Sequence, residues 1–157
     1  SKRVAAARNT SADQATSIIA ESDLWSPVAG LAWGMTQRDF DRAVRERGWK
    51  IDNQNANGII ILFDVNLAGL GPAEVRANFE AGRLVELRGS YRNAPVVRQL
   101  VNAHSGKLGE PDSSNLSENA FDLSEANWTT RDSDGVLRVR MQSTQGNASM
   151  IYRFGRE

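Results

Sequence analysis

His104 is the only histidine in this chain of 157 residues, and no cysteine is present. A histidine-based triad would have to be built around His104, while a histidine-rich metal site, a thiolate zinc site and a cysteine nucleophile are excluded. Because His104 follows Leu100 by four residues, it falls on or beside the apolar face of an expected helix, near the C-terminus of that helix. We therefore expect a structural or helix-capping histidine rather than a catalytic one.

Two short motifs have some of the residues of known ligand-binding loops. Residues 69–72 (GLGP) are glycine-rich, but no Gly-Lys-Ser/Thr follows and Pro72 leads into an expected strand, so a turn is favoured over a phosphate site. Residues 132–135 (DSDG) begin like a calcium loop, but Val136 and Ser143 stand where an EF-hand needs a further carboxylate and a glutamate. We expect an Asp-Gly hairpin turn there.

Pairs of carboxylates could in principle form a hydrolytic dyad, for example Glu74 with Glu86 or Glu118 with Asp122. Arginines are interleaved beside them, which favours solvated salt bridges. The sequence therefore predicts no catalytic residue, no metal site and no cofactor.

Capping signals and apolar periodicity predict two helices and a set of strands. The first helix begins at Thr36, which Asp39 complements as a weak capping box, and it stops at Gly48. The second begins near Pro95 and stops before Gly106. Strands are expected at residues 58–65, 73–79, 84–91, 125–131, 136–143 and 148–154, with at most one short strand in the polar stretch 107–123. Both faces of 58–65 are apolar, so we expect that strand to be central.

These elements predict an α+β fold in which an antiparallel sheet of about seven strands is backed by helices. Residues 1–10 are expected to be a flexible tail and 11–157 a single domain, beginning with a short amphipathic helix over 11–22. Helix followed by strands occurs twice, at 34–91 and 93–155, which suggests two tandem helix-plus-meander units. The alternative, that any α+β chain of this length divides into two such halves, stays open.

The charge balance removes some classes of partner. Nineteen basic and nineteen acidic residues give a net charge of zero, so no overall field favours nucleic acid or an anionic membrane. No stretch reaches the roughly 20 apolar residues of a membrane span, and no signal peptide is present. The chain begins Ser1-Lys2-Arg3 without an initiator Met, which is compatible with the removal of an upstream leader or anchor.

Arginines recur on the polar side of the expected strands. In residues 136–143 apolar side chains alternate with Arg138 and Arg140, so these two arginines should point away from the core. Three more arginines take equivalent outward positions in other strands: Arg76, Arg88 and Arg153. If the five share the open face of one sheet, they form a surface suited to carboxylates or to an acidic protein partner.

Two questions about this surface stay open. Glutamates could neutralise the arginines across the strands, in particular Glu74, Glu86 and Glu125. Trp25, in the linker 23–27, is a further candidate for partner binding if it is an exposed anchor, but it could instead dock on the sheet.

A family resemblance rests on two landmarks. Residues 34–36 (GMT) precede the first helix, and residues 75–85 (VRANFEAGRLV) contain the pattern apolar-x-Phe-x-x-Gly-x-Leu. Over 34–91 this order resembles the small bacterial envelope-protein superfamily that includes the outer-membrane-assembly lipoproteins and the β-lactamase inhibitory protein. The second unit departs from that pattern, because it lacks a GMT start, although it keeps residues 108–111 (LGEP), Trp128 and the ending 152–154 (YRF).

The resemblance implies a tandem fold, a bacterial periplasmic or cell-envelope setting and a role in binding other proteins, without catalytic residues or an identified partner. We therefore favour a non-enzymatic cell-envelope binding or interaction protein that uses an exposed sheet face to hold another protein or an envelope component. The alternative is a small-molecule carrier or an enzyme with a cavity between sheet and helices. A third interpretation takes four Asn-x-Ser/Thr triplets as glycosylation sites of a secreted eukaryotic protein, at Asn9, Asn115, Asn127 and Asn147.

Overall fold

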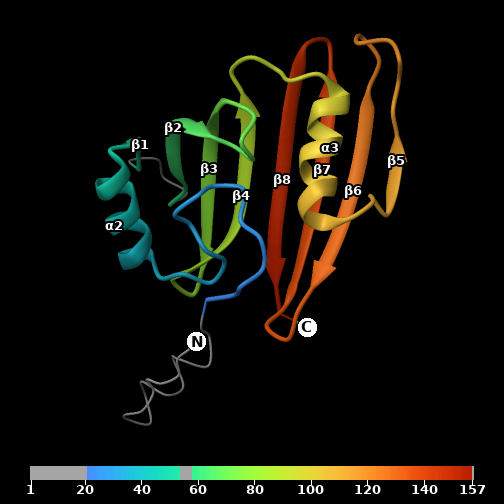
Figure 1. The fold of residues 1–157 in the computed structure, drawn as a ribbon. Coiled ribbons are helices and arrows are strands. Elements are labelled where there is room, and N and C mark those ends of the chain that lie inside the picture. Colours follow the sequence, from blue (N-terminus) through green and yellow to red (C-terminus); the bar gives the residue numbers. More distant parts are fainter. Residues whose placement is uncertain (1–20, 54–57, 157) are drawn as a thin grey trace.

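The computed structural model describes residues 21–53 and 58–156. The expected tail 1–10 and almost all of the expected helix 11–22 lie outside these ranges. Within them, two helices and eight strands form an α+β fold, with one antiparallel sheet in the order β1-β2-β3-β4-β8-β7-β6-β5 (Figure 1). The first four strands of the chain make one half of the sheet and the last four make the other half, in reverse order.

The strands vary widely in length. The long ones are β2 (Ile60–Asn66), β3 (Pro72–Glu80), β4 (Arg83–Tyr91), β6 (Ser124–Arg131), β7 (Val136–Thr144) and β8 (Asn147–Gly155). The two edge strands, β1 (Lys50–Asp52) and β5 (Ser113–Asn115), have three residues each. The expectation of about seven strands is wrong because all residues of both edge strands are exposed, so β1 has no alternation of apolar and polar side chains to reveal it.

β2 does not occupy the central place expected from its two apolar faces. It is second from the edge, between β1 and β3. Ile60 and Leu62 are buried towards the helices, while Ile61 and Phe63 on the opposite face are only half-buried. The apolar second face is therefore part of an open surface rather than of a second core.

The first helix, α2 (Gln37–Arg47), is bounded by the residues that its sequence predicts. The Thr36 hydroxyl accepts a hydrogen bond from the Asp39 backbone N–H at 3.1 Å, and Gly48 ends the helix in a left-handed conformation. The preceding residues are fixed to the β3–β4 hairpin, because Gly34 N donates to Leu84 O at 2.9 Å. The two landmarks of the resemblance thus lie in contact.

The second helix, α3 (Val97–Leu108), continues past the position where it was expected to stop. Gly106 lies inside the helix, and the helix ends at Gly109, whose N–H donates to Ser105 O at 2.9 Å. The Trp128 indole N–H donates to Gly109 O at 3.0 Å and attaches this end to β6. The helix thus ends at the second of two glycines, Gly109, which takes a positive φ of 87°, and not at Gly106.

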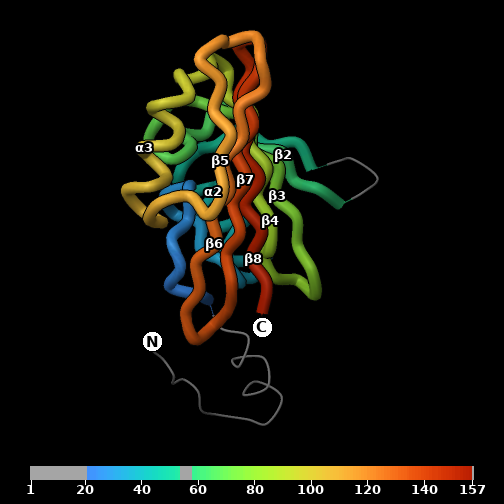
Figure 2. The backbone as a smooth tube through the Cα atoms, turned by 90° about the vertical axis from the view of Figure 1, so that its right-hand side faces the viewer, coloured from blue at the N-terminus to red at the C-terminus, as the bar shows by residue number. Residues whose placement is uncertain are grey.

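The core lies on one side of the sheet. Both helices and the N-terminal segment (residues 22–35) cover that side, and in Figure 2 no helix or strand of the described ranges covers the opposite face. The largest fully buried side chains come from both halves of the sheet and from the segments that cover it: Trp33, Phe40, Leu87, Leu100, Trp128 and Tyr152. One continuous core therefore lies on one side of the sheet, and the described residues leave the other side, called the open face below, uncovered.

Candidate binding surfaces

The open face of the sheet holds the arginines that the sequence singled out. Arg76 lies opposite Arg88 between β3 and β4, and Arg138 lies opposite Arg153 between β7 and β8. Arg140 follows on β7 two residues after Arg138, and all five side chains are exposed. The structure therefore brings the five together on one face, in neighbouring strands.

Glutamates on the same face pair with four of these arginines. The salt bridges are Arg76 Nε to Glu74 Oε2 at 3.5 Å, Arg88 Nε to Glu86 Oε2 at 2.8 Å, Arg140 Nε to Glu125 Oε2 at 3.7 Å, and Arg153 with both Glu80 and Glu86. The three glutamates that the sequence suggested as neutralising partners all take part. The face is consequently a mixed-charge surface, and most of its positive charge is balanced locally.

Glu86 is the centre of this ion-pair cluster. Its side chain is only 10% exposed, and its carboxylate accepts hydrogen bonds from Asn78 Nδ2 at 2.7 Å and from Arg88 Nε at 2.8 Å, with Arg153 at 3.4 Å. Burial alone would raise the pKa of Glu86, but the hydrogen bonds from Arg88 and Asn78 and the charges of Arg88 and Arg153 outweigh it and lower the pKa. Glu86 thereby links β3, β4 and β8 on the open face.

Arg138 differs from the other four. Within the described part of the chain it has no acidic partner. Its neighbours across the strands are Thr129 on β6 and Arg153 on β8, and Arg153 already contacts two glutamates. Of the five arginines, Arg138 is therefore the one whose charge no described residue balances.

Trp25 lies on the other side of the sheet from the arginines. Its ring makes T-shaped contacts with the rings of His104 and Tyr152 at centroid distances of 5.6 and 6.2 Å, and its carbonyl accepts a hydrogen bond from the Trp33 indole N–H at 2.9 Å. Trp25 is thus half-buried and docked above the sheet on the helix side. It cannot belong to the same contact surface as the arginines.

His104 has a structural environment. The ring is fully buried, Nδ1 donates to Leu100 O at 2.7 Å, and Nε2 accepts from the Tyr152 hydroxyl at 2.7 Å. Because a carbonyl oxygen can only accept, Nδ1 must carry the proton, which leaves Nε2 as the acceptor. Burial lowers the pKa of His104, against the smaller opposing effect of the bond to Leu100, and favours the neutral ring. Both nitrogens are occupied, as expected for a structural histidine.

Both of the loop motifs have the hydrogen bonds of turns, as the sequence predicts. Asp132 Oδ1 accepts from the backbone N–H groups of Asp134 and Gly135 at 2.7 and 3.0 Å, which is the geometry of a turn. Gly71 N donates to Asn66 Oδ1 at 3.1 Å, and β3 begins immediately afterwards. Among the residues described, no group of three or more His, Asp or Glu side chains could hold a metal ion.

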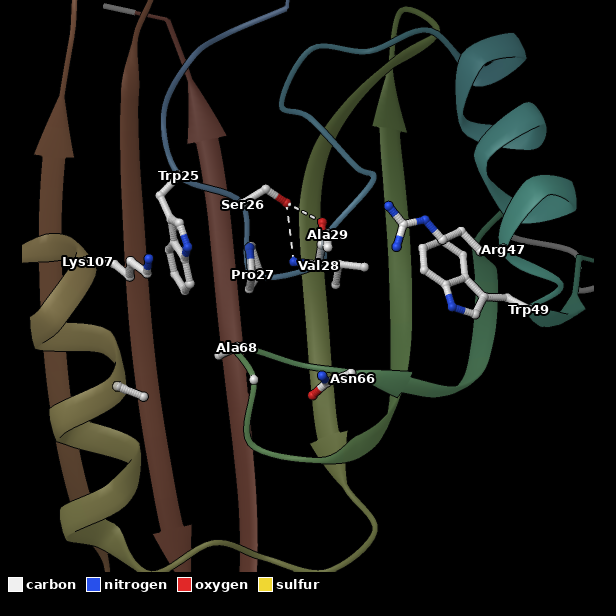
Figure 3. Close-up of a pocket in the computed structure, with 12 residues that line it drawn as sticks. Trp25, Ser26, Pro27, Val28, Ala29, Arg47, Trp49, Asn66, Ala68 and Lys107 are labelled. Atoms are coloured by element: carbon white, nitrogen blue, oxygen red, sulfur yellow. Dashed lines mark hydrogen bonds between the residues drawn. The ribbon is translucent and has the colours of Figure 1, made fainter.

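A cleft lies between α2 and α3, on the helix side of the sheet, and the sequence did not indicate which residues would line it. It has a volume of about 380 Å³, and its lining comes from the N-terminal segment, the end of each helix and the β2–β3 connection. Figure 3 shows Arg47 and Trp49 at its α2 side and Lys107 and Trp25 at its α3 side. Residues from so many separate segments have no common spacing. Of the lining, the sequence singled out only Trp25 and, within the motif 69–72, Gly69.

A smaller hollow of about 310 Å³ lies beside the start of α3. Exposed apolar side chains occur in the same part of the chain, and Phe121 is the most exposed of them at 73%. The loop that carries Phe121 is fastened to the β7–β8 turn, because Gln145 N donates to Ala120 O at 2.8 Å. The described part of the chain shows nothing that covers this apolar loop.

The helices in the described ranges are too short or too polar to cross a membrane. No family model, no curated protein and no solved structure matches this chain, so its membership of the envelope-protein superfamily stays a prediction drawn from the resemblance.

Proposed function

We propose that this chain is a non-enzymatic binding or interaction protein of the bacterial cell envelope, which holds another protein or an envelope component against the open face of its sheet. The observation that carries the proposal is the gathering of five exposed arginines on a face that neither helix covers (Figure 2). Guanidinium groups form two parallel hydrogen bonds with carboxylates and are common in protein interfaces. The partner surface is therefore acidic.

Arg138 is the centre of the proposed contact. An acidic side chain of the partner would neutralise Arg138 without breaking an ion pair within the chain, since no described residue does so. The four paired arginines keep exposed side chains, between 44% and 55%, so they can bind the partner while they remain bound to their glutamates. Because the face carries both arginines and glutamates, it favours a partner whose charged side chains are arranged to complement both.

Two tandem helix-plus-meander units, at 34–91 and 93–155, form part of the same proposal. α2 is followed by β1 to β4, α3 is followed by β5 to β8, and the two halves meet where β4 pairs with β8. The hydrogen bond between Gly34 and Leu84 joins the two landmarks of the resemblance, which supports a common origin with the envelope-protein superfamily. A periplasmic or cell-envelope location follows from that resemblance.

Site-specific photo-crosslinking tests the surface. A photoreactive amino acid at Thr129, next to Arg138 on the open face, should crosslink one defined protein in an envelope extract of the source cells. The same group at Gln99, an exposed position of α3 on the helix side, should not crosslink that protein.

The matched charge reversals are Arg138→Glu on the open face and Arg98→Glu on α3, both at exposed arginines. We expect Arg138→Glu to abolish the Thr129 crosslink through repulsion of an acidic partner, and Arg98→Glu to leave it unchanged. A crosslink that survives Arg138→Glu, or that forms equally well from Gln99, would refute the proposed surface.

A further inference from the structure

The floor of the cleft between α2 and α3 is held in place by hydrogen bonds. Ala68 N donates to Pro27 O at 2.8 Å and joins the β2–β3 connection to the N-terminal segment. The Trp33 indole N–H donates to Trp25 O at 2.9 Å and fixes the same segment to the core. Small-molecule sites are usually preformed in this way and have volumes of about 300–1,000 Å³. The cleft, at about 380 Å³, lies within that range.

The described residues that line the cleft include two cations, Arg47 and Lys107, and no Asp or Glu. Neither cation has an acidic partner in the parts of the chain that the structure describes. Asn66 adds a neutral donor, because its Oδ1 accepts from Gly71 N at 3.1 Å and its Nδ2 is left facing the cleft (Figure 3). The lining thus offers positive charge and N–H donors without a carboxylate to match them.

Arg47 is positioned by a glycine. A Cβ atom at Gly30 would lie only 2.9 to 3.1 Å from three atoms of the Arg47 guanidinium group, so the guanidinium rests directly on the backbone at Gly30. Figure 3 shows the Arg47 side chain extending from the end of α2 towards Ala29. The planar guanidinium group of Arg47 therefore faces the cleft in a defined orientation.

Flat apolar side chains supply the rest of the lining. Trp25 and Pro27 line the part of the cleft nearer α3, and Trp49 lies beside Arg47 at the α2 side (Figure 3). Both indole rings are half-buried, and neither indole N–H donates to a protein acceptor among the described residues. Such walls favour a flat apolar body, and their N–H groups add two more donors.

We propose that this cleft is a binding site for a small, flat, apolar molecule that carries a carboxylate. The carboxylate binds the Arg47 guanidinium, and the apolar body lies against Trp25, Pro27 and Trp49. Lys107 contributes a second positive charge from the α3 side. This site lies on the helix side of the sheet and is independent of the protein contact proposed for the arginine face.

The test uses 2-naphthoate as the ligand and 2-naphthamide as its uncharged analogue of the same shape. We expect saturable binding of 2-naphthoate, with the largest shifts of indole N–H resonances in ¹H–¹⁵N spectra at Trp25 and Trp49. Trp33 and Trp128 are fully buried and donate to backbone carbonyls, so their indole resonances should move less. The amide should bind about tenfold more weakly, because a hydrogen bond to a charged group contributes more than a neutral one.

Arg47→Gln removes the charge at the cleft, and Arg45→Gln removes a charge in the same last turn of α2 from an exposed residue outside the lining. We expect about tenfold weaker binding of 2-naphthoate to Arg47→Gln and unchanged binding to Arg45→Gln. Thermal unfolding of both variants, which alter exposed side chains, should match that of the unmodified chain. Equal affinity for acid and amide, equal behaviour of the two variants, or no binding at all would overturn the proposal.

Discussion

Protonation of His104 is coupled to folding, because its ring is fully buried and both of its nitrogens are hydrogen-bonded. Burial lowers the pKa of His104 below its ordinary value of 6.5. At a pH between the lowered pKa and 6.5, the unfolded chain therefore binds a proton that the folded chain does not bind. The stability that this residue contributes is complete above pH 6.5 and is lost as the pH falls towards the lowered pKa.

We expect the free energy of unfolding to decrease when the pH is lowered from 7.5 to 5.5. The decrease attributable to His104 is at most about 1.4 kcal/mol, because pH 5.5 lies one unit below the pKa of 6.5 that a histidine has in the unfolded chain. Urea unfolding at several pH values measures it. In His104→Leu the overall stability is lower but this dependence should disappear, and a variant that keeps the full dependence would contradict the assignment.

Glu86 allows a second test at a single residue, because it is paired with arginines but has little access to water. Its side chain is 10% exposed, whereas that of Glu74, which also pairs with an arginine, is 41% exposed. Buried charged partners cost more to remove than exposed ones, since removal leaves other polar groups unsatisfied. We expect Glu86→Gln to lower the free energy of unfolding at pH 7 by about 1–3 kcal/mol and Glu74→Gln by less than about 0.5 kcal/mol.

Urea unfolding of the two variants shows how much the burial of Glu86 adds to the loss of stability, because both variants remove a carboxylate that is paired with an arginine. Because the pKa of Glu86 is lowered, the stability that its carboxylate contributes is fully present above pH 4.5, the ordinary pKa of a glutamate. That stability is lost as the pH falls through the lowered pKa. The difference between the variants should therefore shrink in strong acid. Equal losses for both variants at pH 7 would show that the Glu86 cluster adds no more than an exposed salt bridge.

At the scale of elements, the β2–β3 connection depends on a glycine in a neighbouring strand. Leu67 in this connection is fully buried, and its carbonyl accepts a hydrogen bond from the Tyr91 hydroxyl at 2.9 Å. A Cβ atom at Gly89 on β4 would lie 2.3 Å from a methyl carbon of Leu67. The absence of a side chain at Gly89 therefore makes room for the connection to cross the core side of the sheet.

We expect Gly89→Ala to lower the free energy of unfolding by about 1–3 kcal/mol, the usual cost of overpacking a core. Gly155→Ala is the matched control, because it also adds a methyl group to a strand glycine but has no atom within 4 Å of the new Cβ. That variant should be neutral or slightly more stable. Urea unfolding of both variants gives the comparison, and a neutral Gly89→Ala would mean that Leu67 can repack without cost.

For the molecule as a whole, the features that depend on local sequence were predictable and those that depend on long-range register were not. Thr36 and Gly48 bound α2 through contacts within a few residues, so the sequence located it. Alternation predicted that Arg138 and Arg140 point away from the core, since side-chain direction needs no knowledge of the neighbouring strand. The edge strand β1 has no alternating pattern, and only its pairing with β2 defines it.

The same distinction between local and long-range features applies to the candidate sites. The sequence could name glutamates as partners of the arginines, but the link from Glu86 to Arg153 depends on the pairing of β4 with β8. The residues that line the cleft could not be predicted, because Arg47 and Lys107 come from different helices that only the complete fold brings to one place. The sequence left open whether Trp25 is an exposed anchor or docks on the sheet, and the structure docks it on the side opposite the arginines.

The two halves of the sheet share one core, which determines how the molecule should unfold. β4 and β8 pair directly across the centre, and the Trp33 ring stacks on Phe154 with a centroid distance of 6.2 Å. Trp25 in the N-terminal segment contacts Tyr152 in the last strand. The segment before α2 is thus packed on the second half as well as on the first, and neither half has a separate core.

We therefore expect a single cooperative transition, which fluorine NMR of 5-fluorotryptophan can test because the four tryptophans are distributed over the molecule. Trp49 reports on the first half, Trp128 on the second, and Trp25 and Trp33 on the N-terminal segment. All four native resonances should disappear at the same urea concentration. Different midpoints for Trp128 and Trp49 would show that the halves unfold separately despite the β4–β8 pairing. An early loss of Trp25 and Trp33 would show that the N-terminal segment detaches before the sheet opens.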